Sequence, residues 1–339
     1  MPEPRALRAK PAAALVWLLP FSVVAQEKLP TDWVDPLIGT SQSRWIFFSS
    51  TCRPFGLVNL SPDIRTGADS MGGYLYEQTK VRCFSHVHGW QLYGVAVMPT
   101  SGEMLGHRGM DAYASDFSHA SEVMRAGYHK VVLDTYGITA ELTSTTRVGF
   151  HRYTFPGDKP AHVIFDTGAT LMDRIASSEV RRVSDVELAG QAVMAPTLRR
   201  PKPFTVYFVA RFNQPFARFG GWTRGKLAEG AVEKIGGKDA GAFVSFASPL
   251  KGPVLVKVAL SYTSIEAARR NLEAELPHWD FDRVVSESRQ DWNRWLGRIE
   301  VEGGTAAQRT KFYTDQWHAL LGRRIVSDAD GSYCDNTGK

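Results

Sequence analysis

The chain has 339 residues, of which 40 are basic and 35 acidic, and 43% of its residues are hydrophobic. The basic residues are scattered, so the net charge of +5 forms no electrostatic footprint for nucleic acid, and a neutral ligand such as a sugar fits better. The three cysteines lack the Cys-x-x-Cys spacing of a metal site. A disulfide between Cys52 and Cys83 is possible, and the sequence does not decide it.

Residues 1–25 have the pattern of a cleaved secretory signal, with a basic start, an apolar run and an exit of small residues at Ala25. The apolar run is shorter than the roughly 20 residues that span a bilayer, so a permanent anchor is the weaker alternative. Cleavage removes three basic residues and one acidic residue, which lowers the net charge from +5 to +3. We therefore expect an exported protein, periplasmic or extracellular, with no membrane span after cleavage.

Short apolar or alternating runs separated by turn residues predict β-strands between residues 31 and 262. Gly220-Gly221 and Gly236-Gly237 are expected at turns. No helical pattern separates the runs, so they predict a mainly β fold, an antiparallel β-sandwich. The predicted strands are Gly56–Leu60, Val95–Pro99, His129–Leu133, Ile138–Thr145, His151–Thr154, Val163–Asp166, Phe204–Phe212, Ala242–Ala247 and Val254–Tyr262.

After Tyr262 the apolar spacing becomes helical. Ser264 is expected to cap a helix over 265–276 that Pro277 ends, and a second helix is expected over 281–296. Thr305 and Gln308 form a capping-box pattern that opens a third helix, which reaches about Leu321. We place the sandwich domain at 26–263, a helical linker at 264–297 and the start of a further helical unit at 298–339.

The third predicted helix is a single helix and cannot bury its apolar face by itself. Phe312, Trp317 and Leu320 must therefore pack against the rest of the chain or lie exposed.

Residues 83–90 carry groups that a generic core does not need. His86 and His88 are two residues apart, so on a strand they point to one face, and with Trp90 they would form a platform for a sugar ring. In the alternative interpretation, the histidines donate to loop carbonyls and Trp90 fills the sandwich. A zinc site would need a third ligand without recognised spacing, for which the candidates are His107, His119 and His129.

Residues 51–63 form the second motif-rich segment. Pro54 pushes Arg53 toward an extended backbone, and the guanidinium offers five donors for sugar hydroxyls or for a carboxylate. The alternative is a structural ion pair between Arg53 and Asp63. The aromatic segment from Trp45 to Ser50 favours core packing.

Residues 327–333 look like a calcium loop at first sight, but they lack the register and the distal Glu of an EF-hand. No pair of carboxylates in the chain stands out as the acid and base of a hydrolase. Asp134, Glu141 and Asp166 lie within strand patterns, so we expect structural or surface roles for them.

Four segments together, 34–40, 51–63, 83–90 and 148–156, resemble the N-terminal half of glycoside hydrolase family 92, the exo-acting α-mannosidases. The resemblance implies a galactose-mutarotase-like β-sandwich joined by linker helices to an (α/α)6 toroid, of which only the first helix lies in this sequence. It also implies an inverting enzyme that uses calcium to remove terminal α-mannose from glycans. Family members are longer, and they hold two catalytic carboxylates and the calcium in the toroid.

The resemblance therefore predicts a chain without its own catalytic residues or calcium, completed by a helical domain in the same chain or in a second one. It places Arg53, His86, His88 and Trp90 on the sugar-facing wall. The competing hypothesis is a carbohydrate-binding or interaction module without catalytic activity.

The resemblance also identifies the loop at 327–333 as one that lies near the sugar pocket, with Asp328 and Asp330 in matching positions. Where relatives continue with Gly-Met-Asp, this chain has Asp335-Asn336-Thr337, so no catalytic role is transferred to Asp335. The segment from Trp45 to Ser50 departs from the Gly-His-Thr-Phe-Pro-Gly of many relatives, which leaves the linkage preference open.

Overall fold

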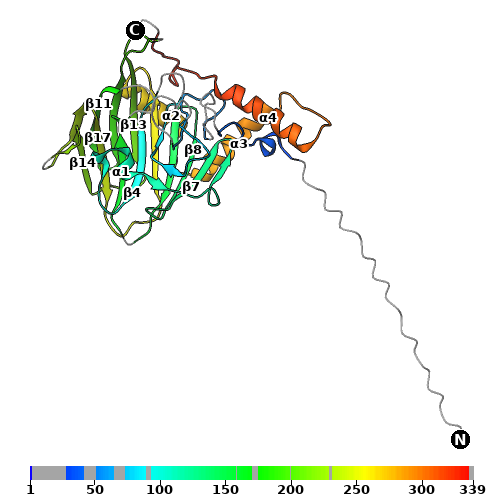
Figure 1. The fold of residues 1–339 in the computed structure, drawn as a ribbon, viewed down its shortest axis with the longest axis horizontal. Coiled ribbons are helices and arrows are strands. Elements are labelled where there is room, and N and C mark those ends of the chain that lie inside the picture. The colour runs from blue at the N-terminus through cyan, green and yellow to red at the C-terminus, as the bar shows by residue number, and fades with distance from the viewer. Residues whose placement is uncertain are drawn as a thin grey trace.

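The computed structural model describes residue 1 and residues 28–41, 51–64, 73–88, 93–157, 159–169, 175–198, 200–228 and 231–335. Two antiparallel β-sheets lie face to face, and three helices follow them in the chain (Figure 1). The predicted secretory signal, the segment from Trp45 to Ser50 and Trp90 lie outside the described residues. The predicted antiparallel β-sandwich is confirmed.

One sheet has seven strands, in the order β1-β3-β4-β10-β17-β14-β15. Their bounds are β1 Ser61–Asp63, β3 Cys83–Ser85, β4 Ala96–Ser101, β10 Ala161–Asp166, β14 Arg218–Thr223, β15 Lys226–Leu227 and β17 Ala240–Phe246. Beside it lie the short pair β2 (Lys80–Val81) and β5 (Ser115–Asp116), the 3-10 turn η2 (Gly106–Arg108) and the helical turn α1 (Met110–Tyr113).

The other sheet has nine strands, in the order β16-β11-β12-β13-β18-β9-β8-β7-β6. Their bounds are β6 Val123–Arg125, β7 Tyr128–Leu133, β8 Ile138–Ser144, β9 Val148–Thr154, β11 Ile175–Ser184, β12 Glu187–Met194, β13 Phe204–Phe212, β16 Lys234–Gly237 and β18 Val254–Ser261.

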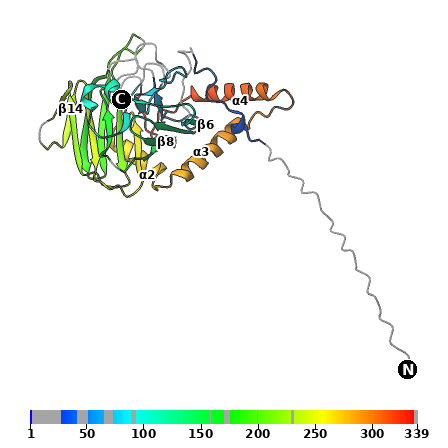
Figure 2. The same ribbon diagram turned by 60° about the horizontal axis from the view of Figure 1, so that its bottom comes forward.

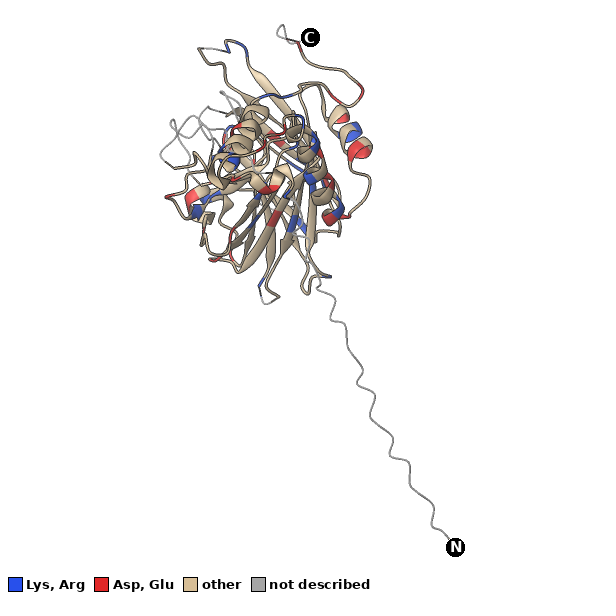
Figure 3. Ribbon diagram, turned by 90° about the vertical axis from the view of Figure 1, so that its right-hand side faces the viewer, with Lys and Arg blue, Asp and Glu red and all other residues tan. Residues whose placement is uncertain are grey.

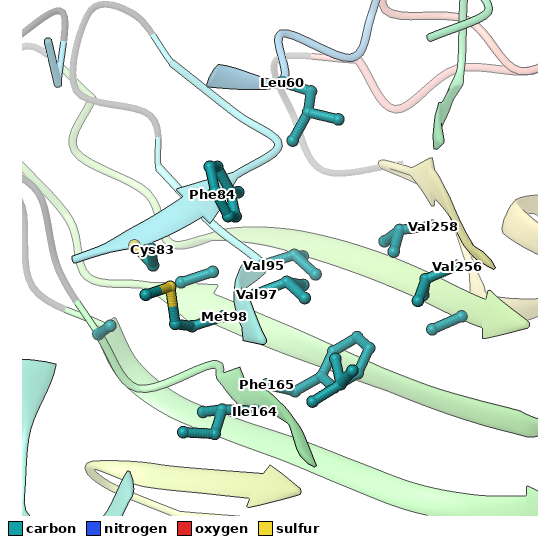
Figure 4. Close-up of a cluster of buried hydrophobic side chains, with 14 of the residues drawn as sticks. Leu60, Cys83, Phe84, Val95, Val97, Met98, Ile164, Phe165, Val256 and Val258 are labelled. Carbon is teal, nitrogen blue, oxygen red and sulfur yellow. The ribbon is translucent and has the colours of Figure 1, made fainter. Parts of the chain in front are cut away.

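The main core lies between the two sheets. Phe165 of β10 stacks on Phe208 of β13 with ring centroids 6.0 Å apart, which joins the two layers directly. Val97 and Met98 of β4 pack in the same buried cluster as Val256 and Val258 of β18 (Figure 4). Strand β4 is buried along its whole length and β18 along nearly all of it, so both lie at the centre of the sandwich.

Eight of the nine predicted strands match observed ones within a few residues, whereas the strand at 56–60 is wrong. There the backbone turns, and the N–H groups of Leu57 and Val58 both donate to the carbonyl of Thr146. The long strands β11 and β12 were not predicted. Strand β11 carries exposed polar and charged residues, and β12 is buried along most of its length, so neither shows a clean alternation.

Of the two glycine pairs predicted at turns, Gly220-Gly221 lies inside strand β14 instead, whereas Gly236-Gly237 ends strand β16 directly before the turn at 238–239. In β14 a glycine is needed for space rather than for bending. A Cβ on Gly220 would lie 2.5 Å from the ring of Phe243, and one on Gly221 would lie 2.5 Å from the carbonyl of Gly241. The glycines thus allow close approach between neighbouring strands.

The predicted helices are confirmed as α2 (Ile265–Glu275), α3 (Phe281–Leu296) and α4 (Ala306–Leu321). The side chain of Ser264 caps α2 by accepting from the N–H of Ala267, and Thr305 forms the expected capping box on α4. Helices α2 and α3 pack on the outer face of the nine-stranded sheet, where Leu272 and Phe281 lie in one cluster with strands β9 and β18 (Figure 2).

Helix α4 packs on α3 rather than standing alone. Trp317 is fully buried, and its ring centroid lies 6.1 Å from that of Trp292. The indole N–H of Trp292 donates to the carbonyl of Cys52 at 2.8 Å, while Phe312 and Leu320 are partly buried at the edge of the same cluster. The helices are therefore fastened to the segment that carries Arg53.

The described residues also bear on three expectations from the sequence: the disulfide, the charge distribution and the membrane span. Cys83 is buried and forms no disulfide, so the Cys52–Cys83 disulfide left undecided by the sequence is absent. Basic and acidic residues are interspersed over the ribbon (Figure 3). In the described part of the chain, no helix is both long and apolar enough to cross a bilayer.

We predict that Trp292→Ala lowers the free energy of unfolding by about 3–5 kcal/mol, because it leaves a cavity between α3 and α4 and removes the hydrogen bond to the carbonyl of Cys52. Urea unfolding followed by circular dichroism measures the change. Trp292→Phe is the matched control, since it keeps most of the packing and loses only the hydrogen bond. Equal stability of the alanine variant and the parent chain would contradict this packing.

Candidate functional site

Four segments without long regular structure meet at one end of the sandwich: 51–60, 83–88, 144–148 and 325–333. Backbone hydrogen bonds join them. These bonds run from Leu57 N to Thr146 O at 2.8 Å, from Asn59 N to His86 O at 2.8 Å and from Ile325 N to Phe55 O at 3.0 Å. The structure thus brings together five of the six candidate residues, Arg53, His86, His88, Asp328 and Asp330.

Arg53 fastens the first of these segments to α3. Its guanidinium pairs with Asp291 and lies 3.6 Å from Glu287, and its Nε donates to the carbonyl of Ser144 at 2.9 Å. The side chain is largely buried, with 8% of the residue exposed. The proposed ion pair with Asp63 is wrong, because the partners come from a helix more than 200 residues away in sequence.

His88 and Asp63 form a fully buried pair, with 2.7 Å between His88 Nε2 and Asp63 Oδ1. His88 Nδ1 donates to the carbonyl of Asn59 at 2.7 Å. The other carboxylate oxygen of Asp63 accepts from the hydroxyl of Tyr93 and from the thiol of Cys83, both at 3.1 Å. Burial raises the pKa of the Cys83 thiol well above its usual value, so the thiol keeps the proton that it donates.

His86 begins a second buried chain of hydrogen bonds, and its geometry fixes every proton. His86 Nδ1 faces the carbonyl of Val95 at 2.6 Å, so it carries the proton and Nε2 accepts. His151 Nε2 then donates to His86 Nε2 at 2.8 Å, and His151 Nδ1 accepts from the hydroxyl of Tyr153 at 2.7 Å. Burial lowers the pKa of His86 to about 4 and that of His151 well below its usual value, so both rings are neutral.

The two histidines are thus bonded to loop carbonyls, as the alternative interpretation of the sequence has it. Both rings are fully buried just beyond the end of β3. Their contact with a sugar, and that of Trp90, stays a prediction.

Asp328 ties the loop at 325–333 to the sandwich and to α2. Its carboxylate accepts from the hydroxyls of Ser261 at 2.9 Å and Thr263 at 2.6 Å and from the amide of Asn271 at 2.7 Å. Only 2% of Asp328 is exposed. The amide oxygen of Asn271 in turn accepts from the N–H of Ala329 at 2.8 Å, so the loop is held by side chain and backbone together.

Asp330 is the one exposed residue among the described candidates. It accepts from Ser332 and pairs with Arg270 at 3.0 Å. The hydrogen bonds from Ser332 lower its pKa to about 2, so it is ionised at neutral pH. Among these five residues, it alone presents a carboxylate to solvent.

The zinc candidates do not assemble with His86 and His88. His119 and His129 both bond to Glu122, at 2.7 and 2.8 Å, and His107 lies at the edge of the seven-stranded sheet. Among the described residues, no group of three metal-binding side chains is placed to hold an ion.

Several residues of this end were not predicted from the sequence. His151 and Tyr153 alternate along β9, which marks an inward face but gives no sign of their partner. Asn271 lies on the buried face of α2, where a polar residue in an apolar stripe signals a specific hydrogen bond. That signal was available in the sequence, whereas the pairing of Asp63 with His88 was not.

Comparison with known protein families finds two matches in chain order. Residues 33–261 match the glycosyl hydrolase family 92 N-terminal domain, and residues 267–339 match the glycosyl hydrolase family 92 catalytic domain. The two matched ranges adjoin between β18 and α2.

Solved structures give the same result. The chain is similar to the family GH92 α-mannosidase BT3965 from Bacteroides thetaiotaomicron, with a TM-score of 0.83 and 27% identity over 93% of this chain and 44% of that one. The complex of BT3965 with mannoimidazole gives a TM-score of 0.83 and 26% identity over 92% and 42%. The GH92 glycosyl hydrolase ccman5 gives 0.77 and 26% over 90% and 42%.

A curated relative from Arthroderma benhamiae, described as an uncharacterized secreted glycosidase, is 23% identical over 329 residues, which are 88% of this chain and 41% of that protein. The chain therefore spans less than half the length of these relatives.

We predict that Asp328→Ala lowers the free energy of unfolding by about 2–4 kcal/mol, because it strands buried donors on β18 and α2. It should also speed hydrogen exchange across residues 325–333. Asp330→Ala is the matched control in the same loop and should leave the urea midpoint unchanged. The role assigned to Asp328 would be wrong if both variants behaved alike.

The neutral histidine chain predicts a loss of stability in acid. The folded-state pKa of His86, about 4, lies below the ordinary value of about 6.5, so its contribution is complete above pH 6.5 and is lost as the pH falls toward 4. His151→Gln keeps a donor and an acceptor but removes one titrating ring. Between pH 6 and 4.5, the parent chain should lose more stability per pH unit than this variant, by up to about 1.4 kcal/mol for the one proton.

Urea unfolding at several pH values measures this difference. Equal slopes for the parent chain and His151→Gln would show that His151 takes up its proton in the folded state.

Proposed function

The chain belongs to glycosyl hydrolase family 92, and from this membership we propose that it forms the N-terminal part of an α-mannosidase that removes terminal α-linked mannose from glycans. The observation that carries the proposal is the similarity to the α-mannosidase BT3965 over 93% of this chain at a TM-score of 0.83, across both the sandwich and the helices. That enzyme is also known in complex with mannoimidazole, which supports a mannose-containing ligand.

In this proposal, the described residues build the rigid support of a sugar-facing wall. Arg53 holds residues 51–60 against α3. His86 and His88 hold residues 83–88 through buried hydrogen bonds, and Asp328 holds the loop that carries Asp330. Rigid placement matters because a hydrolase must hold its sugar to within a fraction of an ångström of the reacting geometry. We propose that Trp90 and Asp330 lie nearest the sugar.

The acid and base of the reaction are proposed to come from outside the described residues. Inversion needs two carboxyl groups about 6.5–9.5 Å apart, with room for a water between them. The carboxylates at this end of the sandwich are already engaged: Asp63 with His88, Asp291 with Arg53 and Asp328 with Asn271. A carboxyl group held by such partners is fixed in position, which suits a supporting role.

Calcium dependence is part of the proposal, but the described residues do not fit the ion. The loop at 327–333 is the best candidate by composition, and its two carboxylates are taken up by hydroxyl, amide and guanidinium donors. Calcium needs 6–8 oxygen ligands, so we propose that it binds elsewhere in the enzyme.

Export is proposed from the secretory pattern at residues 1–25, and it agrees with the secreted glycosidase of Arthroderma benhamiae.

The test is mannose release from an α-mannoside, measured for this chain and for a chain extended through any downstream coding sequence. We expect release only from the extended chain, and we expect excess EDTA to abolish it and added calcium to restore it. Release by the 339-residue chain would overturn the assignment of the acid and base. Absence of release from both chains, with both folded, would contradict the proposed function.

A further inference from the structure

One pocket in the described part of the chain takes no part in the site above. It has a volume of about 880 Å³ and lies where η2, the end of β10 and the tips of two hairpins meet, at the edge of the seven-stranded sheet. Helices α2 and α3 cover the other sheet, and in Figure 1 the strand β14 stands on the side of the sandwich away from α3 and α4. Sites for small ligands have volumes of about 300–1,000 Å³.

Trp222 of β14 forms part of the pocket wall and is locked in place. A Cβ on Gly106 would lie 2.6 Å from its ring, and one on Gly241 would lie 2.1 Å from it. The indole is thus clamped between two glycines of different segments. Its edge gives the pocket a fixed apolar surface beside polar groups.

Two of the carboxylates that line the pocket, Asp166 and Asp239, differ in burial and in hydrogen bonding. Asp166 is held by the hydroxyl of Tyr113 at 2.8 Å, and its pKa is raised to about 6, chiefly by burial with a smaller contribution from the charge of Asp239. Asp239 is exposed at the turn between β16 and β17. His107 also lines the pocket, and its Nδ1 is buried without a hydrogen-bond partner. A buried polar atom without a partner calls for a ligand or water to satisfy it.

The charges that line the pocket cancel. Three cations, Arg108, Arg224 and Lys238, face three carboxylates, Asp111, Asp166 and Asp239. Asp111 is paired with Arg82 at 2.7 Å and Arg108 lies 3.7 Å from Glu103. In contrast, within the described chain no ion pair holds Arg224, Lys238 or Asp239.

A net charge of zero with free donors and free acceptors suits a neutral ligand that both donates and accepts hydrogen bonds. Sugar hydroxyls do both, whereas an anion would meet the carboxylates and a cation would meet the guanidinium and ammonium groups. The apolar edge of Trp222 adds a surface for the C–H groups of a pyranose.

We propose that this pocket is a second glycan-binding site, one that holds an α-mannan chain without cleaving it. The choice of mannan rests on the proposed function, whereas the evidence for a binding site is the pocket and the residues that line it. Asp239 and Arg224 supply the acceptor and donor at its rim, Asp166 and His107 lie deeper, and Trp222 forms the apolar wall.

The test is affinity electrophoresis of the 339-residue chain through gels that contain soluble α-mannan, which reports a dissociation constant. Asp239→Asn and Arg224→Asn each remove one charge-assisted hydrogen bond and should weaken binding about tenfold. Asparagine is chosen because both positions have positive φ, 54° and 50°, which asparagine tolerates. Asp134→Asn, at an exposed aspartate on the other sheet, is the matched control and should bind as the parent chain does.

Three outcomes would overturn the proposal. The first is no retardation of the parent chain, and the second is retardation that both variants leave unchanged, which would place the mannan elsewhere. The third is calorimetric binding of calcium chloride, lost in Asp239→Asn, without binding of mannan, since the pocket would then be a cation site. Because no hydrolysis is measured, the result is separate from the test of the enzyme. An active extended chain with no retardation would refute the second site alone.

Discussion

The buried contact between Asp63 and His88 is the constraint on which this end of the sandwich depends. A buried carboxyl group without hydrogen-bond partners is very unfavourable in a protein interior, so Asp63 must keep its imidazole, thiol and phenol partners together. Those donors come from residues 83–93, and His88 also binds the carbonyl of Asn59. Segments with little regular structure are therefore held by electrostatics where sheet hydrogen bonds are few. Gly73 belongs to the same arrangement, because a Cβ there would lie 2.3 Å from Asp63 Oδ1.

Similar buried contacts connect this end of the sandwich to the helices. Arg53 and Trp292 fasten α3 to residues 51–60, and Asp328 fastens the loop that follows α4 to the base of α2. Each contact joins residues more than 50 positions apart and is largely shielded from water, where hydrogen bonds to charged groups contribute more than at the surface. The sandwich and the three helices consequently form one packed body, in which movement of one segment would strand buried charges on another.

The sequence predicted the elements whose signals are local and missed the contacts that are not. Helices α2 and α4 were predicted because a cap residue lies beside an apolar stripe, and most strands because alternation is visible within a few residues. The partner of Arg53 was missed because Asp291 is 238 residues away. The pair Gly220-Gly221 was misplaced because a glycine that makes room for Phe243 has the same appearance in sequence as a glycine that makes a turn. The family motifs identified the site region, but they did not show that four of its residues are buried. These residues are Arg53, His86, His88 and Asp328.

Two glycan sites at different ends of one sandwich would have a consequence that depends on ligand length. A polymer bound at the distal pocket raises the local concentration of its other chain ends near the sugar-facing wall, but only if it is long enough to reach around the sandwich. A disaccharide is too short to engage both, so the pocket would add nothing to its capture. The rim groups Arg224 and Lys238 lie on hairpin turns and form no ion pair with any described residue, so they can adapt to a heterogeneous polymer. The buried network behind the wall suits one sugar in one orientation.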